Sequence, residues 1–328
     1  MLDGRPGNDI LRAMDVTPDR ELTLSFDDQR AVVSPWGASL RRYYLSTGTG
    51  RPIDIVWGYS GASHKKGGQG DVLIPFPGRI AGGRYSFDGR TFQLECNDKE
   101  GPNAIHGFVR TRPWSVTAER ADHVGFSTTL DSHRDAPKGY PFSLTIMVTY
   151  SLDQRGLSCE FRVTNVGEEP APVGVGFHPY FTLGTDLIDD VEARIPASSF
   201  LEFDRQLAPT GRVISVDGSE WDHRTFSLVG TKRFNHCYYD LERDSNAMAT
   251  ASIRRSDNSR LIEVMMDEAF RAIVVYTGDA IPGEARRAFA IEPMTCATDA
   301  FNHPEWGLKR LAVGESFSGR YVIRHQFG

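Results

Sequence analysis

Residues 142–164 read FSLTIMVTYSLDQRGLSCEFRVT, and this stretch indicates the fold more directly than any other. Apolar and polar side chains alternate on both sides of a polar turn at 153–156. Successive side chains of a β-strand point to opposite faces, so two alternating runs joined by a turn predict an antiparallel hairpin with one buried face.

Similar short runs recur along the chain. A second hairpin is expected at 85–92, where Asp88 and Gly89 form a typical two-residue turn. Further strands are expected at 21–26, 30–34, 38–45, 123–130, 191–195, 271–277, 287–292 and 318–326. Many short strands separated by Gly, Pro, Asn and Asp favour an all-β sandwich or barrel.

Helical periodicity is weak. We expect a short helix near 8–14 and one helical turn near 297–302. The glycine-rich segment 61–70 is interpreted as a mobile loop, not as a boundary between domains. With no repeat or convincing linker, residues 1–328 are predicted to form a single large domain.

The composition excludes several classes of protein. The chain has 328 residues, of which 40% are hydrophobic and 24% charged, as in an ordinary globular protein. A formal net charge of -6 argues against nucleic acid and anionic membrane surfaces as partners. The N-terminus lacks a signal-peptide pattern and no apolar run is long enough to span a bilayer, so we expect a cytoplasmic, soluble protein.

The cysteines do not form a recognisable metal or disulfide pattern. The four of them are far apart, and none are paired as Cys-x-x-Cys. Reduced thiols are therefore expected in place of a disulfide framework or a zinc site, and no metal or cofactor is predicted. The cysteines are Cys96, Cys159, Cys237 and Cys296.

Two ionisable side chains stand near the ends of apolar, strand-like runs. Glu292 ends the run 288–292, and His178 ends the run 173–178. Strand alternation places Ala288 and Ala290 on the face of Glu292, and Gly174 and Gly176 on the face of His178, which we interpret as open space for a ligand. A bend at the glycines with a purely structural histidine remains the alternative.

Two further segments contain candidate binding residues. His106 lies between turn residues and Gly107 in the segment 101–110, which ends at Arg110. Arg79 lies in the apolar, Pro- and Gly-rich segment 73–83. An arginine in such a setting either pairs with a buried carboxylate or offers its donors to a polar ligand.

These segments together resemble one known family. Five short motifs occur in the family's order and match the aldose 1-epimerases, also called galactose mutarotases, from about residue 20 to the C-terminus. The motifs are PGRI (77–80) with GRYSFDG (83–89), PNAIHG (102–107), HPYF (178–181), EPMT (292–295) and DAFN (299–302). The resemblance implies a large antiparallel β-sandwich of the galactose mutarotase-like type with few short helices. It also implies interconversion of the α and β anomers of a free aldohexose without a cofactor.

The resemblance also implies roles for individual residues. Glu292 would be the general base on the anomeric hydroxyl and His178 the general acid on the ring oxygen. His106 and Arg79 would bind sugar hydroxyls and the ring oxygen. A small-molecule sugar is the expected partner, and the chain is expected to be a monomer or homodimer.

The chemistry suits these residue types independently of the resemblance. Opening a hemiacetal removes a proton from O1 and adds one to O5, which a carboxylate and an imidazole can do without redox chemistry. Each positioned acid or base typically contributes about 10²–10⁴-fold. The ordinary pKa of histidine, about 6.5, predicts a rate profile with an acidic limb from Glu292 and a basic limb from His178.

Three positions depart from the family pattern. Gly78 stands where an asparagine is usual, and Phe177 where many members have asparagine. Asn235 corresponds to an aspartate that binds sugar hydroxyls, and Asp240 or Asp267 is a candidate for the missing carboxylate. The preferred sugar therefore stays open.

Aromatic side chains near the site motifs are candidates to stack on the sugar ring. Tyr180 is the first choice, followed by Phe181 and Trp306, although core packing is the ordinary use of such residues. Two alternative functions remain open. One is a mutarotase for hexose 6-phosphates, in which Arg110 or Arg84 would hold the phosphate. The other is a non-catalytic carbohydrate-binding or sugar-sensing protein on the same fold.

Overall fold

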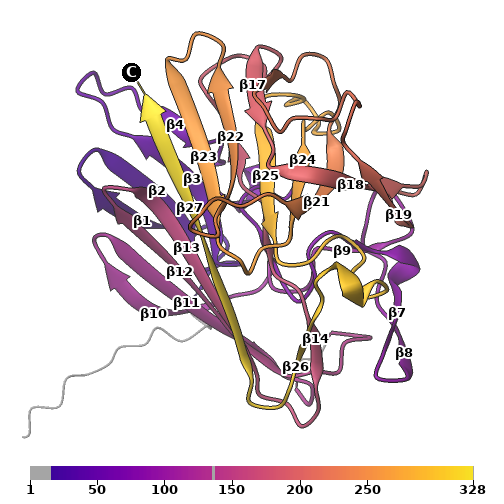
Figure 1. Ribbon diagram of the computed structural model, residues 1–328. Coiled ribbons are helices and arrows are strands. Elements are labelled where there is room, and N and C mark those ends of the chain that lie inside the picture. The colour runs from indigo at the N-terminus through magenta and orange to yellow at the C-terminus, as the bar shows by residue number, and fades with distance from the viewer. Residues whose placement is uncertain (1–15, 135–136, 328) are drawn as a thin grey trace, which may run out of the picture.

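Two large antiparallel sheets form a sandwich in the computed structural model, which describes residues 16–134 and 137–327 (Figure 1). The larger sheet has 12 strands. Its main path runs β1 (Leu22–Phe26), β2 (Gln29–Ser34), β3 (Ser39–Leu45), β4 (Ile53–Val56), β16 (Tyr180–Phe181), β25 (Phe289–Met294), β24 (Ala272–Tyr276), β21 (Asn235–Leu241), β18 (Ala197–Phe203) and β19 (Pro209–Ser215). The short strand β15 (Gly176–Phe177) joins it by pairing with β25 and with β5 (Val72–Leu73).

The second sheet has nine strands and covers one face of the first. Its order is β10 (Ser115–Arg120), β11 (His123–Leu130), β12 (Leu144–Asp153), β13 (Gly156–Asn165), β27 (Ser316–Phe327), β23 (Arg260–Met266), β22 (Ala249–Arg255), β17 (Val191–Arg194) and β20 (Ser227–Leu228). Three small pairs complete the fold: β6 (Arg79–Ile80) with β9 (Ala104–Ile105), β7 (Arg84–Phe87) with β8 (Arg90–Gln93), and β14 (Ala171–Val173) with β26 (Lys309–Leu311).

The all-β sandwich predicted from the alternating runs is confirmed. The stretch 142–164 forms the hairpin β12–β13, in which Val148 pairs with Phe161 and Tyr150 with Cys159. The predicted strand 123–130 coincides with β11 at both ends. The other predicted strands appear within one or two residues of their expected bounds.

Neither of the two expected helical segments is confirmed as a helix. The one near 8–14 lies outside the described residues. The helical turn predicted near 297–302 is a set of hydrogen-bonded turns, and the nearest regular helical turn is the 3₁₀ turn Pro304–Trp306. The described residues contain no α-helix, and their other 3₁₀ turns are Ala62–His64 and Ala81–Gly83. No helix in the described ranges is long and apolar enough to cross a membrane.

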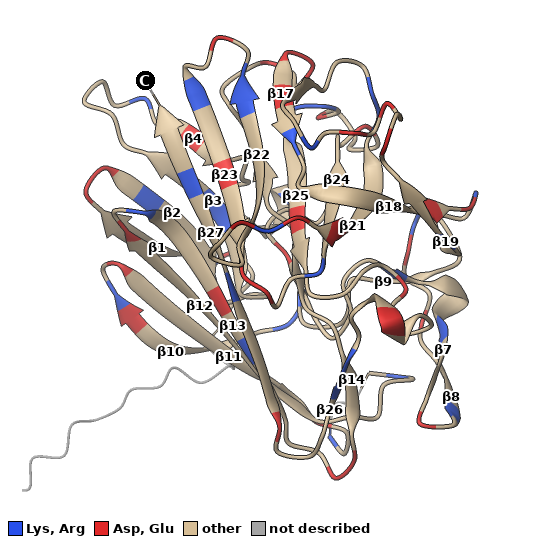
Figure 2. Ribbon diagram, viewed as in Figure 1, with Lys and Arg blue, Asp and Glu red and all other residues tan. Residues whose placement is uncertain are grey.

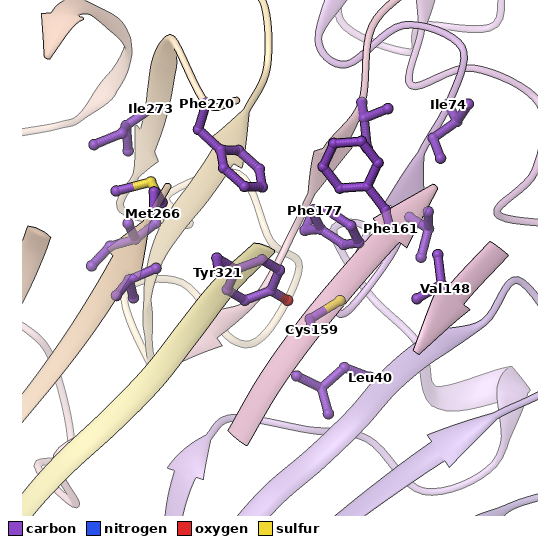
Figure 3. Close-up of a cluster of buried hydrophobic side chains, with 14 of the residues drawn as sticks. Leu40, Ile74, Val148, Cys159, Phe161, Phe177, Met266, Phe270, Ile273 and Tyr321 are labelled. Atoms are coloured by element: carbon purple, nitrogen blue, oxygen red, sulfur yellow. The ribbon is translucent and has the colours of Figure 1, made fainter. Parts of the chain in front are cut away.

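The core between the sheets holds the strand that leads to His178. The ring of Phe177 lies 5.0 Å from that of Tyr321 on β27 and 6.2 Å from that of Phe161 on β13 (Figure 3). Phe270 packs against the same rings. Because Phe177 is fixed in the core, the next side chain along the chain, His178, is directed to the outer face of the larger sheet.

The expectation of open space above the small residues was wrong. Residues 173–178 do not form one strand, since β14 ends at Val173 and β15 begins at Gly176. A Cβ at Gly174 would lie 2.4 Å from Cys296 Sγ, and one at Gly176 would lie 2.6 Å from Pro77 Cβ. These glycines let neighbouring segments approach closely and leave no cavity.

The alanines beside Glu292 are covered in the same way. Ala288 and Ala290 are buried and pack against Tyr180 and Ile281. Charged side chains of both signs are spread over the strands and loops of the sandwich (Figure 2). The cavity that contains the ionisable groups is therefore not the space that was expected above these columns of small residues.

Candidate active site

A cavity of about 530 Å³ lies on the outer face of the larger sheet, and seven of the residues proposed from the sequence line it. The sheet contributes its floor, and its walls include the segments 67–68, 78–79, 97–100, 105–110 and 280–282. The predicted residues found there are Arg79, His106, Arg110, His178, Tyr180, Asn235 and Glu292.

His178 and Glu292 lie next to each other at the bottom of this cavity. His178 Nε2 is 3.4 Å from Glu292 Oε1, and their side chains are 6% and 3% exposed. Both groups therefore reach the cavity through a small accessible surface. The arrangement keeps water away from the pair while leaving one face of each open to a ligand.

Strand pairing determines how Glu292 meets its neighbours. Glu292 on β25 lies opposite Val274 on β24, and Tyr276 on β24 lies opposite Asn235 on β21. Side chains two residues apart on a strand share a face, so Val274 and Tyr276 lie on the side of Glu292. Three adjacent strands thus bring the carboxylate and the Asn235 amide to one surface.

Aromatic and glycine neighbours fix the His178 ring. It stacks on Tyr180 with ring centroids 4.9 Å apart, and it meets His106 edge-on at 5.5 Å. The Tyr180 hydroxyl donates a hydrogen bond to the Gly67 carbonyl at 2.7 Å, which ties the loop to the sheet. A Cβ at Gly68 would lie 3.1 Å from His178 Cδ2.

Of the two uses considered for the aromatics near the site motifs, the structure shows core packing, which was favoured for most of them, and it does not support the stacking role weighed for Tyr180. Tyr180 and Phe181 are both 0% exposed, and Trp306 is 4% exposed. Tyr180 supports His178 and cannot present its face to a sugar. The aromatic side chains that do line the cavity and are partly exposed are Phe203 and Tyr276.

Arg79 shows the first of the two interpretations offered for it, pairing with carboxylates, and binding of a polar ligand stays a prediction. Its Nε donates to Asp98 Oδ2 at 2.7 Å and its Nη2 to Glu100 Oε2 at 2.9 Å. It also lines the cavity, with a side chain 10% exposed. Two carboxylates therefore hold its guanidinium against the site.

His106 and Gly78 depend on an unusual backbone. His106 has φ +66°, and its N–H donates to the Gly78 carbonyl at 2.9 Å. Gly78 has φ +63°, and a Cβ there would lie 2.4 Å from Thr298 Oγ1. The positive φ and this close approach both disfavour a side chain at position 78.

Arg110 is held at the cavity by a buried carboxylate. Its Nη1 lies 3.3 Å from Oδ2 of Asp71, whose side chain is 1% exposed and also pairs with Lys65. The same Asp71 accepts the backbone N–H of His178 through its carbonyl at 3.0 Å. A compact cluster of charges therefore lies beside the histidine.

Burial shifts the pKa values of the two acid–base groups in opposite directions. Burial lowers the pKa of His178 to about 3, and the nearby Arg110 and Lys65 cations also disfavour its protonated form. Burial raises the pKa of Glu292 well above 4.5, and the Arg79 cation offsets part of this rise. The pKa of His106 is lowered by burial and by the neighbouring His178, Arg110 and Arg79. Such perturbed groups in one cavity are typical of catalytic sites.

Several expectations about additional residues were wrong. Asp240 and Asp267 line a different cavity with Arg243 and Arg271, so neither supplies a carboxylate to this site. Arg84 is exposed and is absent from the lining of the cavity. The described residues contain no group of three or more His, Cys, Asp or Glu arranged to hold a metal ion.

Sequence reasoning missed the acidic segment 97–100 and the aromatic lining. Asp98 and Glu100 immediately precede the motif that contains His106, but Arg79 lies 19 and 21 residues away in the chain, so the sequence gave no signal of their pairing. Tyr276 could have been found by strand alternation, because it shares a face with Val274 in a strand that was predicted. Phe203 gave no signal before the strands were paired.

Most of the chain is similar to known proteins of one family. Residues 20–324 match the family model described as aldose 1-epimerase. The chain is 31% identical to the uncharacterized protein YihR of Escherichia coli over 71% of each chain, and 29% identical to galactose mutarotase of Sus scrofa over 90% of each. The fold is similar to that of a GalM/aldose epimerase homologue from C. elegans, with a TM-score of 0.82, 20% identity, and coverage of 94% of this chain and 99% of that one.

Proposed function

The chain belongs to the aldose 1-epimerase family, and we propose that it interconverts the α and β anomers of a free aldohexose by acid–base ring opening. One observation supports this proposal above the others. A carboxylate and an imidazole lie 3.4 Å apart in one cavity, with the exposed part of each facing the same space. O1 and O5 of a hemiacetal are bonded to the same carbon, so their acid and base must lie side by side.

In the proposed mechanism, Glu292 accepts the proton of O1 while His178 delivers a proton to O5. The C1–O5 bond breaks and C1 becomes an aldehyde carbon. Rotation about C1–C2 presents the other face of the aldehyde, and the two proton transfers then run in reverse to close the ring. Proton number and charge balance over the cycle, and no external reactant is needed.

The ionisation of the pair is compatible with these roles. Burial favours the neutral form of both groups, so the free site holds one proton on Glu292 and leaves His178 neutral. Transfer of that proton to His178 Nε2, 3.4 Å away, gives the ionised pair at the same total proton count. Sugar hydroxyls that hydrogen-bond to the carboxylate favour its ionised form and promote this transfer.

A neutral hexose suits the cavity better than a phosphorylated one. Of the two arginines considered as phosphate ligands, Arg84 is outside the cavity and Arg110 is already paired with Asp71. Arg79 is likewise neutralised by Asp98 and Glu100. The remaining polar groups, including His106 and Asn235, are suited to hydroxyls.

Polarimetry tests the proposal directly. The protein is expected to accelerate the approach to anomeric equilibrium of fresh α-D-glucose or α-D-galactose, after the spontaneous rate is subtracted. Glu292→Gln keeps the shape but cannot accept a proton, so kcat is expected to fall at least about 100-fold. Glu119→Gln, on the exposed strand β10, is the matched control and is expected to leave kcat unchanged.

Two results would count against this function. A loss of less than tenfold in Glu292→Gln would remove the assigned base. Saturable sugar binding without faster mutarotation would instead favour a sugar sensor.

A further inference from the structure

Three carboxylates line the cavity, and apart from the proposed base Glu292 only one of them has free capacity to bind a sugar hydroxyl. Glu292 is nearly buried beside His178. Asp98 is 3% exposed and already accepts hydrogen bonds from Arg79, from the Asn103 amide and from the backbone N–H of residue 100. Its lone pairs are engaged by the protein.

Glu100 differs from Asp98 in both exposure and bonding. Its side chain is 43% exposed and its residue lines the cavity. Oε2 accepts from Arg79 Nη2 at 2.9 Å, whereas Oε1 has no hydrogen bond to any residue in the ranges 16–134 and 137–327. An ionised carboxylate can accept about four hydrogen bonds, so Glu100 keeps most of its capacity for a ligand.

The ion pair with Arg79 gives Glu100 a defined position. Arg79 is itself held by Asp98 through a second contact, so the guanidinium cannot move freely. The pair presents a fixed acceptor beside a fixed donor. Adjacent hydroxyls of a sugar offer both donor and acceptor functions, which matches such a pair.

The negative charge of Glu100 also affects a residue of the sheet on the other side of the cavity. Burial raises the pKa of Tyr276, and the negative charge of Glu100 contributes to this rise. Tyr276 lies directly opposite Asn235 in the strand register. Glu100 and Asn235 therefore face the same space from the loop and from the sheet.

We propose that Glu100 is a substrate-binding residue that accepts hydrogen bonds from sugar hydroxyls and supplies the carboxylate that is absent at Asn235. This inference rests on the proposed function of the same site. It assigns hydroxyl recognition to the loop 97–100, whereas the acid–base step belongs to the sheet.

Substrate binding in Glu100→Gln tests the inference. A hydrogen bond made in both ground and transition states affects KM and leaves kcat largely unchanged. Loss of one or two charge-assisted bonds is expected to raise KM, and the sugar dissociation constant, about 10- to 100-fold. Glu95→Gln, an exposed carboxylate in the same segment and outside the cavity lining, is the control and is expected to change neither value.

Monodeoxy sugars separate binding from a structural effect. In the unaltered protein, one deoxy position of glucose or galactose is expected to bind at least about 10-fold more weakly than the parent sugar. In Glu100→Gln this difference is expected to shrink to less than about 3-fold, because the partner of that hydroxyl is gone. A general loosening of the loop would weaken all deoxy sugars equally and leave the difference intact.

Restoring a carboxylate on the sheet provides a second readout. The double variant Glu100→Gln with Asn235→Asp is expected to regain at least part of the lost affinity. Unchanged KM and dissociation constant in Glu100→Gln, or an unchanged pattern over the deoxy sugars, would overturn the inference. Binding is measured by calorimetry as well as kinetics, so the inference can fail while mutarotation stands, and it can hold for a protein that binds sugar without turnover.

Discussion

At the residue scale, the behaviour of the site depends on one histidine and one glutamate that share a dry environment. A charged group loses hydration when it is buried, so burial favours neutral imidazole and neutral carboxyl alike. This places the pKa of Glu292 above that of His178, the reverse of their ordinary order. The sequence prediction, which used ordinary values, assigned the two limbs of the pH profile the other way round, so the two assignments predict different profiles.

The pH dependence of kcat/KM follows from this reversed order. The active pair carries one proton, so activity falls when a second proton is added or the last one is lost. We expect the acidic limb near pH 3, where His178 titrates, and the basic limb at the raised pKa of Glu292. Polarimetric rates between about pH 4 and 9 test whether activity is kept down to pH 4 and look for the basic limb. A basic limb that persists unchanged in Glu292→Gln, or a decline beginning below about pH 6, would contradict the assignment.

The buried carboxylate also makes the protein less stable at high pH. The folded protein keeps a proton that the unfolded chain releases near pH 4.5, so the free energy of unfolding falls as pH rises from there through the folded-state pKa of Glu292. Glu292→Gln lacks this titration. The variant is expected to be more stable than the parent at pH 8 and nearly equal to it at pH 4.5.

Urea denaturation at the two pH values measures this difference. His178 makes the free energy of unfolding depend on pH in the opposite direction. Because its folded-state pKa is lowered, the free energy of unfolding falls as pH falls from 6.5 toward 3. A Glu292→Gln variant that is equally stable or less stable at pH 8 would show that the folded carboxyl is not destabilised by burial.

At the element scale, the loop before β5 is the structure that covers His178. Gly67 accepts the Tyr180 hydroxyl through its carbonyl, and Gly68 lies against the histidine ring. Lys66 extends the contact to the segment after β24 by donating to the Pro282 carbonyl at 3.2 Å. Glycines at positive φ thus allow the backbone to lie where a side chain would displace a catalytic group.

Gly68→Ala is expected to reduce kcat about 10- to 100-fold, because its Cβ would meet His178 Cδ2 at 3.1 Å and move the ring. Gly50→Ala is the matched control. Gly68 has φ +74° and Gly50 has φ +76°, so both variants suffer a similar backbone penalty of about 1–2 kcal/mol. Only Gly68 has neighbours within 4 Å.

Melting temperature and polarimetric kcat are measured for both variants. Similar losses of stability with loss of activity in Gly68→Ala alone would support the close contact. Equal activities in the two variants would contradict it.

At the scale of the whole molecule, the site depends on the packing of one sheet against the other. Phe161 belongs to the nine-stranded sheet and packs against Phe177 and Phe270 from the opposite side of the core (Figure 3). The residue after Phe177 is His178. The position of His178 therefore depends on how the nine-stranded sheet packs against the larger one.

Phe161→Ala is expected to lower the free energy of unfolding by about 3–5 kcal/mol, because Phe161 is only 2% exposed and leaves a cavity. Met147→Ala, on the exposed face of the neighbouring strand and 40% exposed, is expected to cost less than about 0.5 kcal/mol. Urea denaturation measures both. Similar values for the two variants would show that this cluster does not support the sandwich.

The sequence by itself determined the fold class and most of the strands. The alternation in 142–164 depends only on which face of a strand is buried, and the hairpin β12–β13 followed from it. The sequence also pointed to seven residues that line one cavity, in large part through the resemblance of its motifs to one family.

Only the tertiary structure decided what these residues touch. Strand alternation says which face a side chain takes but not what covers that face, so the glycines and alanines beside His178 and Glu292 were read as open space when Pro77, Cys296 and Tyr180 fill it. The pairing of Arg79 with Glu100 and the opposed pKa shifts depend on contacts between segments far apart in the chain. Burial and electrostatic interaction are properties of the assembled surroundings, and a linear pattern contains neither.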